Sequence, residues 1–93
     1  MNKHFRYSVE NLDDLKQLVA QSKHSDTMPV YGNITLEVLC NGNCVCIDLR
    51  NYCNDDDTFV SGWVVSKQEF AEMTEADFNR IVNCMYRVYC EEE

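Results

Sequence analysis

An Asn41-Gly42 dipeptide between two aliphatic segments is the feature that most constrains the fold of this chain. A type I′ β-turn needs positive φ at both central residues, and Asn-Gly is the dipeptide that accepts this best. With these two residues as the loop, two strands present three aliphatic pairs on one face: Val38 with Val45, Leu36 with Ile47, and Ile34 with Leu49. A three-residue loop would place Leu36 opposite Asp48, so the pattern predicts a two-residue hairpin with one buried face.

A third strand is predicted over Phe59–Val65, antiparallel to the second, after a loop at 51–58. Trp63 on this strand is interpreted as a core or core-edge residue. The other face of the hairpin is mixed, and it has a small apolar spot near the turn at Leu39, Cys44 and Cys46. A weak alternation at 3–7 predicts one further short strand.

Along the chain, helices are predicted both before and after the strands. Ser8 is a candidate N-cap, and apolar residues recur after it at helical spacing, which predicts a helix over about 9–23. Ser66-Lys67-Gln68-Glu69 is a capping box, and a second start of this type begins at Thr74, so helices are expected over about 67–73 and 75–90. The sequence therefore predicts one α+β domain over 1–93, ordered α-β-β-β-α-α, with a three-stranded antiparallel meander packed against helices.

Negative charge is concentrated in the second half of the chain. Residues 1–52 carry six acidic and five basic residues, whereas residues 53–93 carry ten acidic and three basic ones, a net charge of −7. A field of this sign repels nucleic acid and anionic membranes and attracts basic surfaces. No direct nucleic-acid binding and no membrane binding are therefore expected. An apolar segment of transmembrane length and a secretory signal are both absent from the sequence, which favours a cytoplasmic location.

Six cysteines, at positions 40, 44, 46, 53, 84 and 90, follow no zinc-knuckle spacing. In a reducing cytosol they are interpreted as free thiols that behave as small apolar residues. Disulfides and a metal site are the alternatives. No cofactor and no metal are expected.

Catalytic and calcium signatures are weak. Nothing marks a cysteine and a histidine as a nucleophile–base pair, so the chain is not expected to be an enzyme. Asn54-Asp55-Asp56-Asp57-Thr58 lacks the spaced carboxylates and the distal glutamate of an EF-hand loop, and is interpreted as a solvated acidic loop.

Two acidic groups are the candidate partner-binding residues. One is the aspartate run, with Tyr52 beside it as an aromatic contact, and the other lies around the junction of the last two helices. The residues are Asp55, Asp56, Asp57, Tyr52, Glu69, Glu72, Glu75 and Asp77. Together with the terminal glutamates, these clustered carboxylates can imitate part of the phosphate array of DNA, and tyrosine is common in binding hot spots. Glu91, Glu92 and Glu93 are expected to form a frayed tail that adds long-range attraction.

In length, element order and acidic charge the chain resembles small phage-encoded anti-CRISPR inhibitors, some of which occupy the DNA-reading groove of the effector nuclease. The resemblance covers the whole chain as layout and charge, without a shared motif, and six cysteines are not typical of such inhibitors. It implies an acidic inhibitor that binds the basic, nucleic-acid-binding surface of a partner protein. The alternatives are a small interaction subunit or antitoxin-like partner that binds through an apolar sheet face, and a cysteine-based metal or redox module. Charge alone also fits a purely solubilising role.

Overall fold

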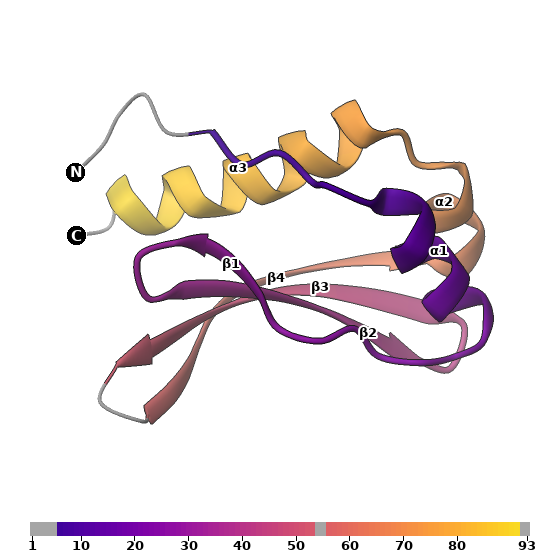
Figure 1. Cartoon of the computed structure of the whole chain (residues 1–93), viewed down its shortest axis with the longest axis horizontal. Coiled ribbons are helices and arrows are strands. Elements are labelled where there is room, and N and C mark those ends of the chain that lie inside the picture. Colours follow the sequence, from indigo (N-terminus) through magenta and orange to yellow (C-terminus); the bar gives the residue numbers. More distant parts are fainter. Residues whose placement is uncertain (1–5, 54–55, 92–93) are drawn as a thin grey trace.

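The computed structural model of the chain describes residues 6–53 and 56–91, and at residues 53, 56, 57 and 91 it describes the backbone alone. These residues form α1 (Leu12–Ala20), β1 (Met28–Tyr31), β2 (Ile34–Asn41), β3 (Cys44–Cys53), β4 (Asp56–Ser66), α2 (Lys67–Glu72) and α3 (Glu75–Glu91). The strands make one antiparallel sheet in the order β1-β2-β3-β4, and the helices lie on one of its faces (Figure 1). The α+β class and the antiparallel meander are confirmed.

The sheet has four strands, so the prediction of three was wrong. The strand that was not predicted is β1, and a turn at Gly32 and Asn33 separates it from β2. Gly32 takes a φ of +58°, a conformation that costs glycine little, and Tyr31 pairs with Ile34 across the turn. A Gly-Asn dipeptide recurs at 42–43, so the same two-residue turn forms both hairpins.

The register of the β2–β3 hairpin also differs from the prediction. Its loop residues are Gly42 and Asn43, while Asn41 is a strand residue paired with Cys44. The observed pairs are therefore Val38 with Ile47 and Leu36 with Leu49, and not those predicted. Gly42 has a φ of +61° at the first turn position, as in a type II′ turn. The shift moves each partner by two residues, so the aliphatic face is the one predicted.

Several element boundaries were also wrong. The predicted loop at 51–58 is mostly strand, because β3 continues to Cys53 and β4 begins at Asp56. The first helix begins at Leu12 with Asn11 as its N-cap, not at residue 9 after Ser8. The backbone N–H groups of Tyr7 and Val9 instead donate to asparagine side chains of α3, which holds residues 7–9 outside the helix. Of the strand predicted at 3–7, residues 3–5 lie outside the described residues, and 6 and 7 are not in a strand.

The core lies between the sheet and the helices. Both later helices form where predicted, at 67–72 and 75–91. The largest fully buried side chains come from β2, β3, α2 and α3: Phe70, Phe78, Leu36, Ile47, Leu49, Val38, Val45 and Val82. The Phe70 and Phe78 rings meet edge to face, with centroids 6.2 Å apart, which fixes α2 against α3.

Candidate partner-binding groove

Two caps place a group of carboxylates at the junction of α2 and α3. Glu69 N donates to Ser66 Oγ at 3.0 Å, and Glu69 Oε1 accepts from Ser66 N at 3.2 Å, so the predicted capping box begins α2 directly after β4. Thr74 and Asp77 bond each other in the same reciprocal way, at 3.1 and 3.4 Å. Acidic side chains in a first helical turn are also favoured by the helix dipole. Local capping therefore explains why Glu69 and Asp77 lie close to this junction.

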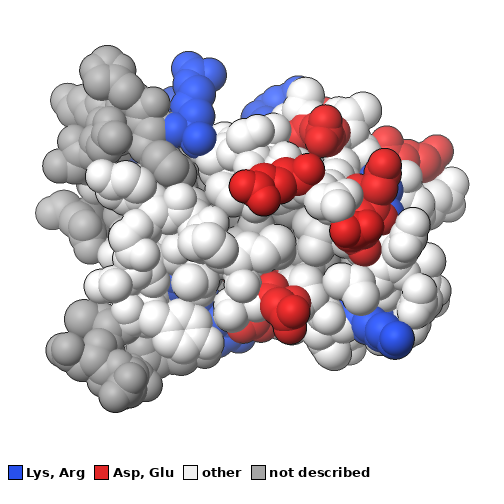
Figure 2. Space-filling view, viewed as in Figure 1, with Lys and Arg blue, Asp and Glu red and all other residues white. Residues whose placement is uncertain are grey.

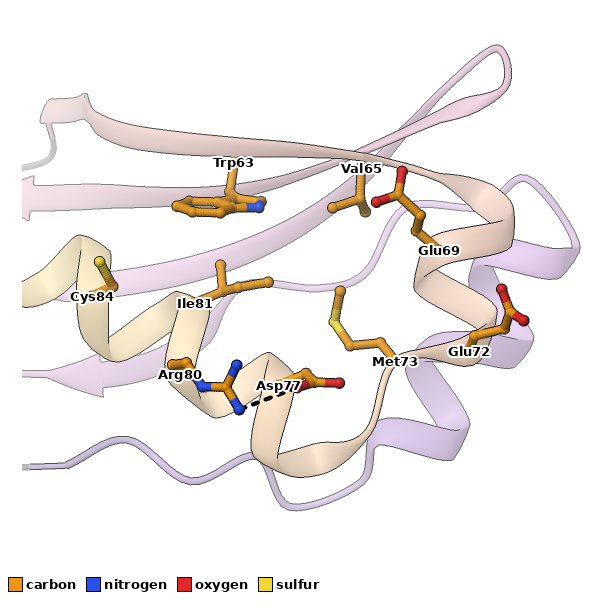
Figure 3. Close-up of a pocket in the computed structure, with 9 residues that line it drawn as sticks. All are labelled: Trp63, Val65, Glu69, Glu72, Met73, Asp77, Arg80, Ile81 and Cys84. Atoms are coloured by element: carbon orange, nitrogen blue, oxygen red, sulfur yellow. Dashed lines mark ion pairs between the residues drawn. The ribbon is translucent and has the colours of Figure 1, made fainter.

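A groove with a volume of about 600 Å³ runs between the end of β4, α2 and α3 (Figure 3). Trp63 and Val65 extend from β4 toward α3, where Ile81 faces them. Trp63 belongs to an edge strand and is 42% exposed, whereas its cross-strand partner Ile47 is fully buried. The lining residues form an apolar floor with a charged rim: Trp63, Val65, Glu69, Glu72, Met73, Asp77, Arg80, Ile81 and Cys84.

The rim of the groove carries an excess of negative charge. Three of the lining side chains are carboxylates and one is basic. Arg80 Nη2 lies 3.3 Å from Asp77 Oδ1, which offsets part of this charge. Lys67, on the first turn of α2, donates from Nζ to Ser22 Oγ at 2.7 Å. Glu69 and Glu72 are both exposed, and in Figure 3 Val65 lies between Glu69 and the indole ring, while Glu72 lies farther along α2.

The structure brings only some of the predicted binding residues together. Glu69, Glu72 and Asp77 line the groove, and Glu75 is exposed on the first turn of α3. In Figure 2, acidic side chains gather over the half of the molecule that holds α1 and α2. Glu69 is the third residue after the end of β4, so the acidic group lies close to that end of the strand.

The aspartate run lies at the other end of β4. Asp56 and Asp57 are the first two residues of β4 and pair with Cys53 and Tyr52, while Asp55 lies outside the described residues. At about 3.3 Å per residue, Asp57 and the start of α2 are roughly 30 Å apart. Tyr52 is 38% exposed. The two acidic groups therefore form two separate sites on the surface.

The outer sheet face, which the helices leave uncovered, carries a second feature. Leu39, Cys46 and Val64 are consecutive cross-strand partners on β2, β3 and β4, and Val64 is 62% exposed. They form an apolar row beside the buried Asp48, whose Oδ2 lies 3.7 Å from Arg50 Nη2. The apolar spot predicted at Leu39, Cys44 and Cys46 is thus extended onto β4.

Five of the six cysteines have described side chains. Cys40, Cys44, Cys46, Cys84 and Cys90 are free, and no metal-binding group of three ligands occurs among the described residues. Burial raises the pKa of the Cys46 thiol, and the nearby Asp48 and Cys44 raise it further. A nucleophilic cysteine needs a lowered pKa, so the shift at Cys46 runs in the opposite direction.

Trp63 is the residue of this groove that the sequence did not indicate as functional. Its strand was predicted, but the exposure of Trp63 depends on how far α3 covers β4, and the alternation of residues along a strand gives no information about that.

Comparison of the chain with protein-family models, curated proteins and solved structures finds no match. In the described part of the chain no helix has the length and apolar character needed to span a membrane.

Proposed function

We propose that this protein is an acidic inhibitor that binds the basic, nucleic-acid-binding surface of a partner protein, and that it is not an enzyme. The observation that carries the proposal is the groove at Trp63, which combines an exposed indole ring and an apolar floor with three carboxylates in its lining. The small anti-CRISPR inhibitors that the chain resembles in layout and charge act on partners of this kind, and we propose an anti-defence role of the same type. We also propose that it acts in the cytosol.

The chemistry of the groove matches cationic side chains. Carboxylates on the rim attract Lys and Arg and repel phosphate. The face of an indole ring attracts a cation by about 0.5–2 kcal/mol, and Trp is among the residues most enriched in binding hot spots. A surface that binds phosphates with Lys and Arg is therefore a suitable partner, while nucleic acid itself is not.

The aspartates at the start of β4 have a different role in this proposal. They lie on the strand that leads to the groove but at its far end, so they add to the long-range field without lining the groove. Charges at such a distance mainly change the association rate and its salt dependence.

The apolar row of Leu39, Cys46 and Val64 favours a second candidate function, an interaction subunit or antitoxin-like partner that binds through the outer sheet face. Binding of this kind depends little on salt, whereas charge-driven binding weakens as ionic strength rises.

Two matched triple variants separate these roles. Glu69→Gln/Glu72→Gln/Asp77→Asn and Asp55→Asn/Asp56→Asn/Asp57→Asn each remove three carboxylates, so the net charge changes equally. Gln at position 69 and Asn at position 77 keep a side-chain oxygen for each cap. A third variant, Leu39→Ser/Val64→Thr, alters the outer face without changing the charge.

The partner is first captured from a nuclease-treated lysate of the host cell at low and high salt, and its binding kinetics are then measured with each variant. We expect the groove variant to speed dissociation, the aspartate variant to slow association, and duplex DNA to compete for the same surface. Direct binding of DNA by this chain, or no competition by DNA, would overturn the proposal. Loss of binding only in the outer-face variant would establish the second candidate instead.

A further inference from the structure

The free edge of β4 is a second feature of the groove region. In the sheet order β4 pairs with β3 on one side, and among the described residues no strand lies on its other side. Natural edge strands are usually short or carry Lys or Pro, which discourages pairing with another chain. β4 spans 11 residues; its charged residues are Asp56 and Asp57 at the start, and residues 58–66 contain no charged residue and no Pro. Its one irregularity is the register shift opposite Leu49 and Arg50, so residues 61–66 continue as a regular edge.

Exposed apolar side chains lie on both faces of this edge. Trp63 is exposed on the groove face, and Phe59 and Val64 are 56% and 62% exposed on the outer face. A strand added beside β4 would cover all three side chains while its backbone completes the unpaired ladder. We propose that an extended basic segment of the partner binds here as a fifth strand.

Charge decides which chain fits this edge. In an antiparallel pair of two copies centred on residue 61, Asp56 of one copy would lie opposite Ser66 of the other, close to the start of its acidic α2, and each copy carries a net charge of −8. Like charges in such positions oppose the pairing. A basic segment instead meets an acidic group at each end of β4.

The alternation of a strand sets the chemistry of the segment. Successive side chains point to opposite faces, with about 6.7 Å between side chains on the same face. Those on the groove side face the Trp63 ring and a rim in which the carboxylates of Glu69, Glu72 and Asp77 outnumber the single base, Arg80, so Arg or Lys is favoured there. Those on the other side meet Phe59 and Val64, so apolar residues are favoured. The binding segment therefore alternates basic and apolar residues.

This inference rests on the proposed function, since it names the partner chemistry of the same groove. The probe is a peptide of about eight residues, a typical strand length, in which Arg and Val alternate. Its control has the same composition with the arginines and valines in two blocks. Two further peptides carry N-methyl groups on either the arginine or the valine amides. Trp63 is the single tryptophan of the chain, so its fluorescence reports binding directly.

We expect the alternating peptide to shift the Trp63 emission and to bind at least about tenfold more tightly than the block peptide, as backbone pairing with side-chain pockets implies. N-methylation of one alternate set of amides should abolish binding, and methylation of the other set should not, because only one set faces β4. The Glu69→Gln/Glu72→Gln/Asp77→Asn variant should bind the peptide more weakly.

Equal binding of both sequence isomers, equal binding of both methylated peptides, or no binding would overturn strand addition. In that case a partner captured through the groove carboxylates would still support the proposed function. Conversely, peptide binding as expected with a partner that has no nucleic-acid site would overturn the proposed function and leave strand addition in place.

Discussion

Asp48 lies directly opposite Gly62 across the β3–β4 ladder, and the missing side chain of Gly62 provides the space that the carboxylate occupies. A Cβ at position 62 would stand 3.0 Å from Asp48 Oδ1 and 3.1 Å from Phe59 Cζ. Asp48 is only 8% exposed, although it lies on the sheet face that the helices leave uncovered. Burial raises the pKa of its carboxyl group, and Arg50 partly opposes that change. The Phe59 ring beside Gly62 helps to shield the acid from solvent.

Gly62→Val is expected to lower the free energy of unfolding by about 1–3 kcal/mol, the usual effect of forcing extra atoms into a packed position. Urea denaturation measures it. The same substitution in an Asp48→Ala background should cost less, because one of the two close contacts is gone. An equal cost in both backgrounds would show that Asp48 does not set the constraint.

Gly42→Val is expected to lower the free energy of unfolding by about 1 kcal/mol or more, because valine resists positive φ. A Cβ at Gly42 meets nothing within 4 Å, so the cost comes from the backbone alone. Asn43→Ala is the matched control. Ser22 is the only non-glycine residue with positive φ in the described part of the chain, so Asn43 has negative φ and alanine is expected to fit there without backbone strain. An unchanged denaturation midpoint for Gly42→Val would contradict the turn geometry.

The hairpin illustrates how much of the fold the sequence determines. Alternation identified the buried face of β2 and β3 correctly, because residues two apart on a strand share a face. The pairing was wrong because Asn41-Gly42 and Gly42-Asn43 are both acceptable turns, and each gives aliphatic pairs on the same face. The missed strand β1 has the same origin, because Gly32-Asn33 is also a hairpin dipeptide.

The candidate groove was predictable only in part. The capping pattern indicated that Glu69 and Asp77 lie at helix starts, because a capping box is a local signal. Trp63 reaches this site through tertiary packing. Its exposure follows from the edge position of β4 and from how α3 crosses the sheet, and neither is encoded in the strand pattern itself.

Tyr86 predicts a loss of stability in alkaline solution. Burial, and then a hydrogen bond with Cys90, raises the pKa of Tyr86 from 10.0 to about 12. The unfolded chain therefore loses this proton first, so stability is fully present below pH 10 and falls as the pH rises toward about 12. Tyr86→Phe should lose less stability over this range, as measured by urea midpoints at several pH values. Lysines titrate in both proteins, so the difference between the variant and the parent protein reports Tyr86. Identical losses of stability at alkaline pH in the two proteins would refute the role of Tyr86.

Asn83 holds the N-terminal segment against α3 through both backbone groups of one residue. Its Oδ1 accepts from Tyr7 N at 2.6 Å, and its Nδ2 donates to Tyr7 O at 2.9 Å. Asn79, one turn earlier, makes a single bond of this kind by accepting from Val9 N at 2.7 Å. The two asparagine side chains thus supply backbone hydrogen-bond partners to residues 7–9, as a neighbouring strand would.

Asn83→Leu keeps a similar side-chain volume but leaves both Tyr7 groups without these partners, so we expect it to lower the free energy of unfolding by about 1–3 kcal/mol. Asn79→Leu, which removes one such bond, should cost less. Urea denaturation measures both variants, and amide hydrogen exchange at Tyr7 and Val9 shows where protection is lost. In Asn83→Leu the Tyr7 amide should exchange faster, while amides in the β2–β3 ladder should change only as far as global stability does. If Tyr7 exchange is unchanged in that variant, or if Asn79→Leu costs more than Asn83→Leu, other contacts hold the segment in place.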